Sequence, residues 1–171
     1  MIPYLPKPEY PIDERFIEIL RAVKEDTSSE GIDCMLVGAT ARDILLTNVF
    51  GILAPRATKD MDFAVAVKDW GQFEALRSRL SARPGFKEGR EQQRLIYSGI
   101  DNNDYYPLDL VPFGGVSHGN NEIAWPPDMA IIMNIAGYDE ALTAAVSVKF
   151  ADDLEGKIVS LAGLAMLKIF A

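Results

Sequence analysis

The segment that most constrains the fold is residues 60–67, which read DMDFAVAV. Its length and residue types predict a β-strand, in which successive side chains point to opposite faces of the sheet. Asp60 and Asp62 therefore share one face. The other face carries only apolar side chains, namely Met61, Phe63, Val65 and Val67. We expect helices to cover the apolar face and the two carboxylates to lie on the more open one.

Helical and extended patterns alternate along the chain, which predicts an α/β fold (α+β): a mixed β-sheet with helices packed mainly on one face. The expected helices are 13–28, 40–47, 70–80 and 161–171. The expected strands are 33–37, 60–67, 93–98 and 105–112, with three more near 130–135, 144–150 and 157–159. Four prolines make residues 1–12 an extended N-terminal arm, and residues 13–171 form one domain.

The composition excludes several classes of protein. Seventeen Lys and Arg against twenty-five Asp and Glu give a net charge of −8, which argues against a general nucleic-acid coat. One cysteine and one histidine build neither a disulfide framework nor a common structural zinc site. No apolar run approaches the ~18 residues of a membrane span, and the first residues lack the apolar core of a signal peptide. We expect a cytoplasmic protein with no membrane partner.

A third carboxylate strengthens the pair in segment 60–67. Asp109 lies within the apolar run PLDLVPF (107–113), where an unpaired charge is costly. If strand 105–112 lies beside strand 60–67, three carboxylates converge, and carboxylates are ligands that Mg²⁺ or Mn²⁺ accepts together with substrate phosphates. The alternative for Asp60 and Asp62 is that they are residues of a turn before the strand.

Features suited to phosphate lie just upstream. A strand, then Gly38-Ala39-Thr40, then a helix is the arrangement in which backbone N–H groups bind an anion. Arg42, Arg56 and Lys59 are candidates to neutralise a triphosphate. The alternatives are that Gly38 only forms a tight turn and that both arginines are solvated. Walker A and GxGxxG phosphate motifs are absent from the sequence.

Three motifs in order resemble the DNA polymerase beta nucleotidyltransferase superfamily: VGATARDILL (37–46), RATKDMDF (56–63) and LDLVPF (108–113). The first is also similar to the opening motif of tRNA CCA-adding enzymes. The second motif, together with the segment LKIFA (167–171) near the end of the chain, is more like the bacterial AbiE-type (AbiEii-like) abortive-infection toxins. The resemblance implies a polymerase-beta-like core and NMP transfer from an NTP to an acceptor hydroxyl, with release of pyrophosphate.

The resemblance also implies a role for each matching residue. Metal binding and catalysis fall to Asp60, Asp62 and Asp109. Nucleotide binding falls to Gly38, Ala39, Thr40, Arg42, Arg56 and Lys168. The implied cofactor is Mg²⁺ or Mn²⁺, and NTP is the substrate. The acceptor is open among tRNA, a protein and a small molecule, and a toxin–antitoxin role would add an antitoxin protein as a partner.

Two departures from the family pattern keep an alternative open. Ala39 replaces the usual Gly or Ser of the turn, and the family's motifs after Lys168 are missing. The alternative is a non-catalytic nucleotidyltransferase-like binding module. The apolar helix 161–171 ends without a cap, so we expect the domain to be truncated at its C-terminal end and to self-associate through this helix. A DxD phosphatase is disfavoured because Ala64 stands where those enzymes want Thr.

Overall fold

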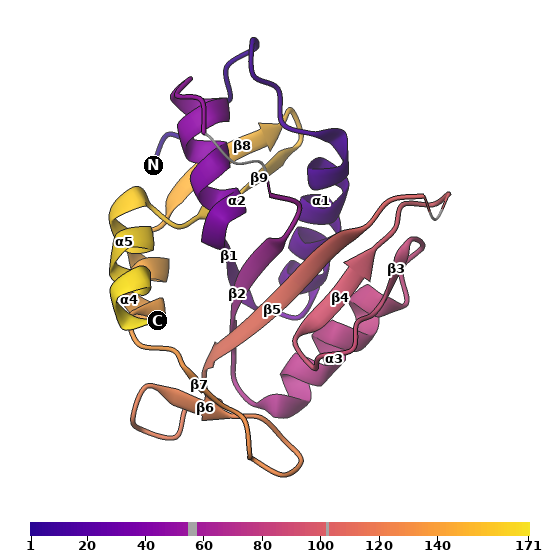
Figure 1. The fold of residues 1–171 in the computed structure, drawn as a ribbon, viewed down its shortest axis with the longest axis vertical. Coiled ribbons are helices and arrows are strands. Elements are labelled where there is room, and N and C mark those ends of the chain that lie inside the picture. The colour runs from indigo at the N-terminus through magenta and orange to yellow at the C-terminus, as the bar shows by residue number, and fades with distance from the viewer. Residues whose placement is uncertain (55–57, 102) are drawn as a thin grey trace.

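The expected mixed sheet is present and the predicted fold class is confirmed (Figure 1). The structure is a computed structural model that describes residues 1–54, 58–101 and 103–171. Within these residues seven strands form one sheet in the order β3-β4-β5-β2-β1-β9-β8, and β6 and β7 form a separate hairpin. The strands are β1 Asp33–Val37, β2 Met61–Val67, β3 Phe86–Glu88, β4 Arg94–Tyr97, β5 Tyr106–Gly114, β6 Glu122–Ala124, β7 Ile132–Asn134, β8 Val146–Ala151 and β9 Leu154–Ile158.

The centre of the sheet joins segments that are far apart in the sequence. Strand β2 runs antiparallel to β1 and parallel to β5. Its apolar face is buried, as the alternation predicts: Phe63, Val65 and Val67 are at most 3% exposed. The strand begins at Met61, so Asp60 lies just before it rather than within it.

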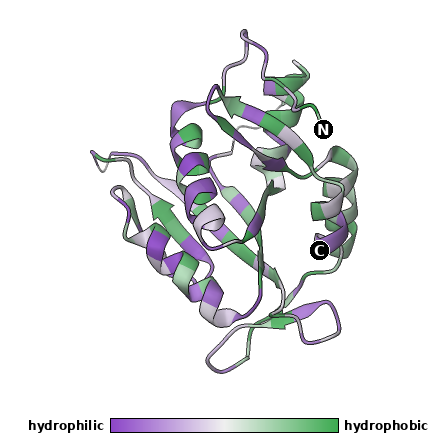
Figure 2. Cartoon of the chain, turned by 180° about the vertical axis from the view of Figure 1, so that it is seen from behind, coloured by the Kyte–Doolittle hydropathy of each residue, from purple (hydrophilic) through white to green (hydrophobic). Residues whose placement is uncertain are grey.

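Helices α1 (Glu14–Ser29) and α3 (Trp70–Ser81) cover the apolar face of the sheet. Each begins at an aspartate whose side chain accepts a hydrogen bond from a backbone N–H of the first turn, which caps the helix: Asp13 for α1 and Asp69 for α3. Figure 2 shows this side of the molecule, where hydrophilic residues gather on the outer sides of the helices. Helices α1 and α3 thus bury their apolar sides against the sheet, as their amphipathic patterns predict.

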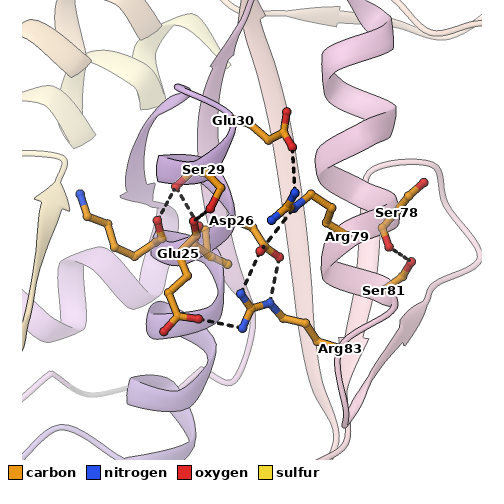
Figure 3. A network of polar contacts seen from close by, with 11 residues as sticks. Glu25, Asp26, Ser29, Glu30, Ser78, Arg79, Ser81 and Arg83 are labelled. Carbon is orange, nitrogen blue, oxygen red and sulfur yellow. Dashed lines mark hydrogen bonds and ion pairs between the residues drawn. The ribbon is translucent and has the colours of Figure 1, made fainter.

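A network of ion pairs holds α1 to the end of α3 (Figure 3). Asp26 is 3% exposed, and the guanidinium of Arg83 donates to both of its carboxylate oxygens at 2.9 and 2.8 Å. Arg83 also pairs with Glu25 at 2.9 Å, and Arg79 pairs with Glu30 at 3.2 Å. The buried carboxylate is therefore fully matched by donors, as a buried charge requires.

Helices α2, α4 and α5 lie outside the layer of α1 and α3, with α4 and α5 side by side (Figure 1). Helix α2 is Gly38–Asp43 and continues into a π-helical segment, Ile44–Val49, so it begins two residues earlier than expected. Helix α4, Tyr138–Thr143, was not expected, whereas α5, Leu161–Phe170, was. No helix in the described part of the chain is long and apolar enough to cross a bilayer.

The N-terminal arm is extended and lies against an edge of the sheet. Tyr4 forms a parallel bridge with Val148 of β8, with backbone hydrogen bonds of 2.8 Å to Ser147 O and 2.9 Å from Lys149 N. At the opposite edge lies β3, a strand of three residues.

Candidate nucleotide and metal site

Two of the predicted carboxylates lie side by side on neighbouring strands in the middle of the sheet. Asp62 of β2 and Asp109 of β5 are direct partners in the parallel register, so their side chains share a face. Burial, and to a smaller extent the negative charges of Asp109 and Asp60, together raise the pKa of Asp62 to about 6. The exposed Asp60 completes the acidic group from the residue before β2.

The turn before α2 approaches this pair closely. In the antiparallel register Val37 is the partner of Asp62, and the next residue, Gly38, has a φ of +73°. A Cβ at Gly38 would lie only 2.1 Å from Oδ2 of Asp62. Only glycine therefore fits both the backbone angle and the space, and the start of α2 lies against the carboxylate.

The residues after Gly38 divide into two groups. Thr40 is 1% exposed, and its hydroxyl donates to the backbone carbonyl of Asp60. Its side chain thus ties α2 to the residue before β2 and is turned away from solvent. Ala39 and Arg42 line a pocket instead, and Arg42 is anchored by Asp43, which accepts from Nε at 2.8 Å and lies 2.6 Å from Nη2.

The pocket has a volume of about 700 Å³ and joins α2, the sheet, α4 and α5. Five of the predicted site residues line it: Gly38, Ala39, Arg42, Asp62 and Lys168. The rest of the wall is mainly apolar and includes Leu46, Val111, Met133, Tyr138, Leu161 and Leu164. Acidic, basic and apolar surfaces thus meet in one cavity, which is typical of a small-molecule site.

Tyr138, at the start of α4, was missed by the sequence reasoning. Burial raises the pKa of its phenol, and the nearby charge of Asp62 raises it further. Its ring packs 5.7 Å from that of Phe113 in β5. A short helix starting at a tyrosine has no distinctive pattern, so the sequence alone offered no signal for it.

Arg94 was also missed. It begins β4, and its antiparallel partner in β5 is Asp109. Nε donates to Oδ1 at 2.8 Å and Nη2 donates to Oδ2 at 2.8 Å, which is a two-point fork. The hydrogen bonds to Asp109 raise the pKa of Arg94 above its ordinary value. The predicted hairpin of 93–98 and 105–112 held a signal, because pairing around its centre places position 94 opposite position 109.

The donor set suits a hard divalent cation only in part. Carboxylate oxygens at Asp60 and Asp62 are appropriate ligands, and the pKa of Asp62 is raised first by burial and then by neighbouring negative charge, which a cation would offset. Asp109 already has an arginine on both oxygens. Among the described side chains no group of three His, Cys, Asp or Glu is arranged to hold a metal ion.

Two predicted phosphate partners remain to be considered, and the described one, Lys59, does not line the pocket. Arg56 is outside the described residues. Lys59 places its ammonium 5.1 Å from the centre of the Tyr106 ring, a cation–π contact.

Comparison with known proteins gives matches among solved structures only, since no family model and no curated sequence matches the chain. One is the lincosamide antibiotic adenylyltransferase LnuA in its lincomycin-bound form, with 12% identity, a TM-score of 0.48, and coverage of 92% of this chain and 85% of that chain.

A second is the antibiotic-resistance factor ANT(2'')-Ia, with 15% identity, a TM-score of 0.48, and coverage of 90% of this chain and 69% of that one. A third is a CCA-adding enzyme in complex with ATP, with 14% identity, a TM-score of 0.40, and coverage of 78% of this chain and 33% of that one. At these identities and TM-scores the matches carry no conclusion about the activity of this chain.

Proposed function

We propose that this chain is a nucleotidyltransferase that moves an NMP from an NTP to an acceptor hydroxyl. One observation carries the proposal: the glycine turn at the start of α2 lies directly against Asp62, beside a pocket that Lys168 also lines. Elements suited to phosphate and to a cation are thereby adjacent. Such adjacency is what transfer of a phosphoryl group requires, because its catalysis is mostly positioning and charge neutralisation.

Different parts of the pocket suit different parts of a nucleotide. Its apolar wall, with Tyr138 and Leu164, suits a base and sugar. Arg42 and Lys168 supply positive charge for the triphosphate. Gly38 and Ala39 line the same pocket, where their backbone N–H groups are candidates to bind the phosphates.

In the proposed reaction Asp109 accepts the proton of the acceptor hydroxyl. That oxygen then attacks the α-phosphorus in line, and the bond to the β-phosphate oxygen breaks as pyrophosphate leaves. Asp60 and Asp62 would hold Mg²⁺ or Mn²⁺, whose charge offsets the negative charge of the phosphates. Thr40 keeps Asp60 in place through its hydrogen bond to the Asp60 carbonyl.

A second candidate is a non-catalytic nucleotidyltransferase-like binding module. The fork of Arg94 on both oxygens of Asp109 favours it, because that carboxylate is already neutralised. We keep the toxin–antitoxin role as the specific form of the enzymatic proposal, since the motif RATKDMDF and the late Lys168 resemble AbiE-type toxins.

The test has two stages on the full chain. Calorimetric titration with each NTP and Mg²⁺ should show binding, and Asp62→Asn should abolish it. The matched control is Asp152→Asn, because Asp152 is a fully exposed aspartate of the β8–β9 turn.

Incubation with each α-labelled NTP and total cell extract then asks which acceptor becomes labelled. Binding without labelling of any acceptor would favour the binding module. Absence of NTP binding by the wild type would contradict both candidates. Growth arrest on expression, lost in Asp62→Asn, would support the toxin role.

A further inference from the structure

A cavity of about 70 Å³ lies on the side of the sheet that α1 covers. Its helical wall comes from α1, where Leu20, Val23 and Thr27 follow one another at the three- and four-residue spacing of one helix face. The strands contribute buried apolar side chains, namely Leu36 of β1, Phe63 of β2, Phe150 of β8 and Leu154 of β9. The inner walls of the cavity are therefore apolar.

The cavity exists because two small residues are neighbours in the sheet. Met35 of β1 pairs with Lys157 of β9 in the parallel register. Cys34 and Gly156 each come one residue earlier, so they lie side by side on the two strands, and both line the cavity. A Cβ at Gly156 would lie 3.1 Å from Cε2 of Phe150, so a larger residue there would displace the ring. The sheet thus offers little side-chain volume to α1 at these positions.

The mouth of the cavity carries an unpaired cation. Two of its charged residues pair with each other, Lys157 with Asp33 at 3.0 Å. Glu155, also at the mouth, accepts a hydrogen bond from the hydroxyl of Ser147. Lys24 of α1 is exposed and takes part in no ion pair within the described part of the chain. An anion at the mouth would therefore meet a free ammonium.

The thiol of Cys34 borders the cavity without adding a charge. Burial raises its pKa to about 12, so the thiol is neutral at ordinary pH. The positive charge of Lys24 acts against this rise, which indicates that the ammonium lies near the cavity. A neutral interior is thus joined to a cationic mouth.

We propose that this cavity is a second ligand site, separate from the nucleotide pocket, that binds a short-chain carboxylate with its chain inside and its carboxylate on Lys24. The volume sets the length of the chain. An apolar cavity of about 150 Å³ binds benzene, so a volume of about 70 Å³ fits a chain of roughly three to four carbon atoms. The free ammonium sets the charge, because it favours an anionic end group over a neutral or cationic one.

The experiment titrates sodium butyrate into the isotope-labelled full chain, without nucleotide, and follows the amide chemical shifts by NMR. Butyrate should bind saturably with a Kd in the millimolar range, as expected for a ligand of so few atoms. Sodium acetate, which lacks two methylene groups, should bind about tenfold more weakly, and butylammonium chloride should be weaker by at least a similar factor. Absence of saturable butyrate binding would overturn the inference, as would equal affinity for butylammonium.

Three variants locate the site. Cys34→Ile should fill the cavity and weaken butyrate binding by about tenfold or more. Lys24→Gln should weaken it by about threefold, which is typical of losing a solvent-exposed ion pair. Lys87→Gln, at an exposed lysine of β3 outside the cavity, is the matched control and should leave the affinity unchanged. Wild-type affinity in Cys34→Ile or in Lys24→Gln would contradict the proposed site.

Should Cys34→Ile fail to fold, the wild type supplies the deciding measurement. Cys34 is the only cysteine of the chain, so labelling by methyl methanethiosulfonate reports on the cavity wall alone. Saturating butyrate should slow this labelling several-fold, whereas acetate at the same concentration should not. Equal labelling rates with and without butyrate would overturn the inference.

Discussion

At the scale of single residues, the site is defined by how little room surrounds Asp62. A glycine approaches it on one side and a second carboxylate lies opposite it on the next strand. Burial and the second carboxylate make the ionised form of Asp62 costly when no cation is present. The first two predictions measure the steric part and the electrostatic part of this arrangement separately.

Gly38→Ala should displace the carboxylate of Asp62 and abolish binding of NTP with Mg²⁺. It should also lower the free energy of unfolding by more than Gly31→Ala does. Gly31 is the matched control, because it has a similar φ of +65° but a Cβ there would meet nothing within 4 Å. The backbone strain of about 1 kcal/mol is thus common to both variants, and only Gly38→Ala adds a clash. Urea unfolding of the two variants measures the difference, and equal losses would contradict the close approach.

Asp62→Asn should stabilise the folded chain at neutral pH. The pKa of Asp62 is raised from 3.8 to about 6 in the folded state, so the folded state binds more protons than the unfolded state between these values. Stability is therefore lost as the pH rises through this window and stays lower above it. Asp62→Asn should recover on the order of 1–3 kcal/mol near pH 7.5, and the gain should vanish below about pH 4.

Urea unfolding at the two pH values measures the effect of this substitution. A gain that is the same at both pH values would show that the titration of Asp62 is not its cause.

How far the sequence predicts the site depends on whether the relevant pattern is local. The alternation in 60–67 placed Asp62 on the open face, and the isolated charge in 107–113 indicated Asp109. Neither segment by itself indicates Arg94, because its pairing with Asp109, 15 residues away, follows only from the register between two strands. The hydrogen bond of the buried Thr40 hydroxyl likewise cannot be predicted locally, because its acceptor is the backbone carbonyl of Asp60, 20 residues away.

At the scale of elements, α5 connects the end of the chain to the pocket. Its apolar residues Leu164 and Leu167 line the cavity together with Lys168, while Ile169 and Phe170 on the same helix remain 80% and 45% exposed. Ser160 caps the helix by accepting a hydrogen bond from Gly163 N at 3.1 Å. The helix thus presents one charged residue to a wall that is otherwise mainly apolar.

Lys168→Gln should weaken NTP binding by roughly tenfold without changing the melting temperature, because the exposed ammonium meets phosphate but supports no packing. Lys87→Gln, at an exposed lysine of β3 remote from the pocket, is the control and should change neither quantity. Calorimetry and thermal unfolding give the two readings. Equal affinities in Lys168→Gln and the wild type would remove Lys168 from the site.

Elements were predictable where their pattern was long. The apolar stripe of α1 and the alternation in β2 each extend over at least seven residues, and both elements lie where expected. Helix α4 spans only six residues and begins after Gly137, which has a φ of +84°. A segment so short has little periodicity of its own, and its helical state depends on packing against α5 and β5.

At the scale of the whole molecule, the helical layer that supports the sheet and the candidate site lie on opposite sides of that sheet. Helices α1 and α3 form the supporting layer, and the buried Asp26 joins them through Arg83 (Figure 3). A rigid layer behind β2 and β5 keeps the two carboxylates of the site in register. The ion pair between Asp26 and Arg83 should therefore contribute more to stability than an ion pair at the surface usually does.

Asp26→Ala should destabilise the chain by about 2 kcal/mol, because it removes the buried acceptor of two charge-assisted hydrogen bonds from the half-buried Arg83. Asp153→Ala is the control: Asp153 pairs with Arg21 at 2.8 Å but in an exposed position, so its loss should have little effect. Urea unfolding midpoints compare the two. Similar midpoints would mean that burial does not strengthen the pair between α1 and α3.

The pairing of Tyr4 with β8 bears on how the sheet avoids polymerisation. An unpaired edge strand offers its N–H and C=O groups to another chain and can seed edge-to-edge aggregation. The arm occupies part of the β8 edge, while the opposite edge, β3, is three residues long and carries Lys87 and Glu88. Growth of the sheet from one molecule into the next is thereby disfavoured at both ends, so a short proline-rich arm contributes to colloidal stability.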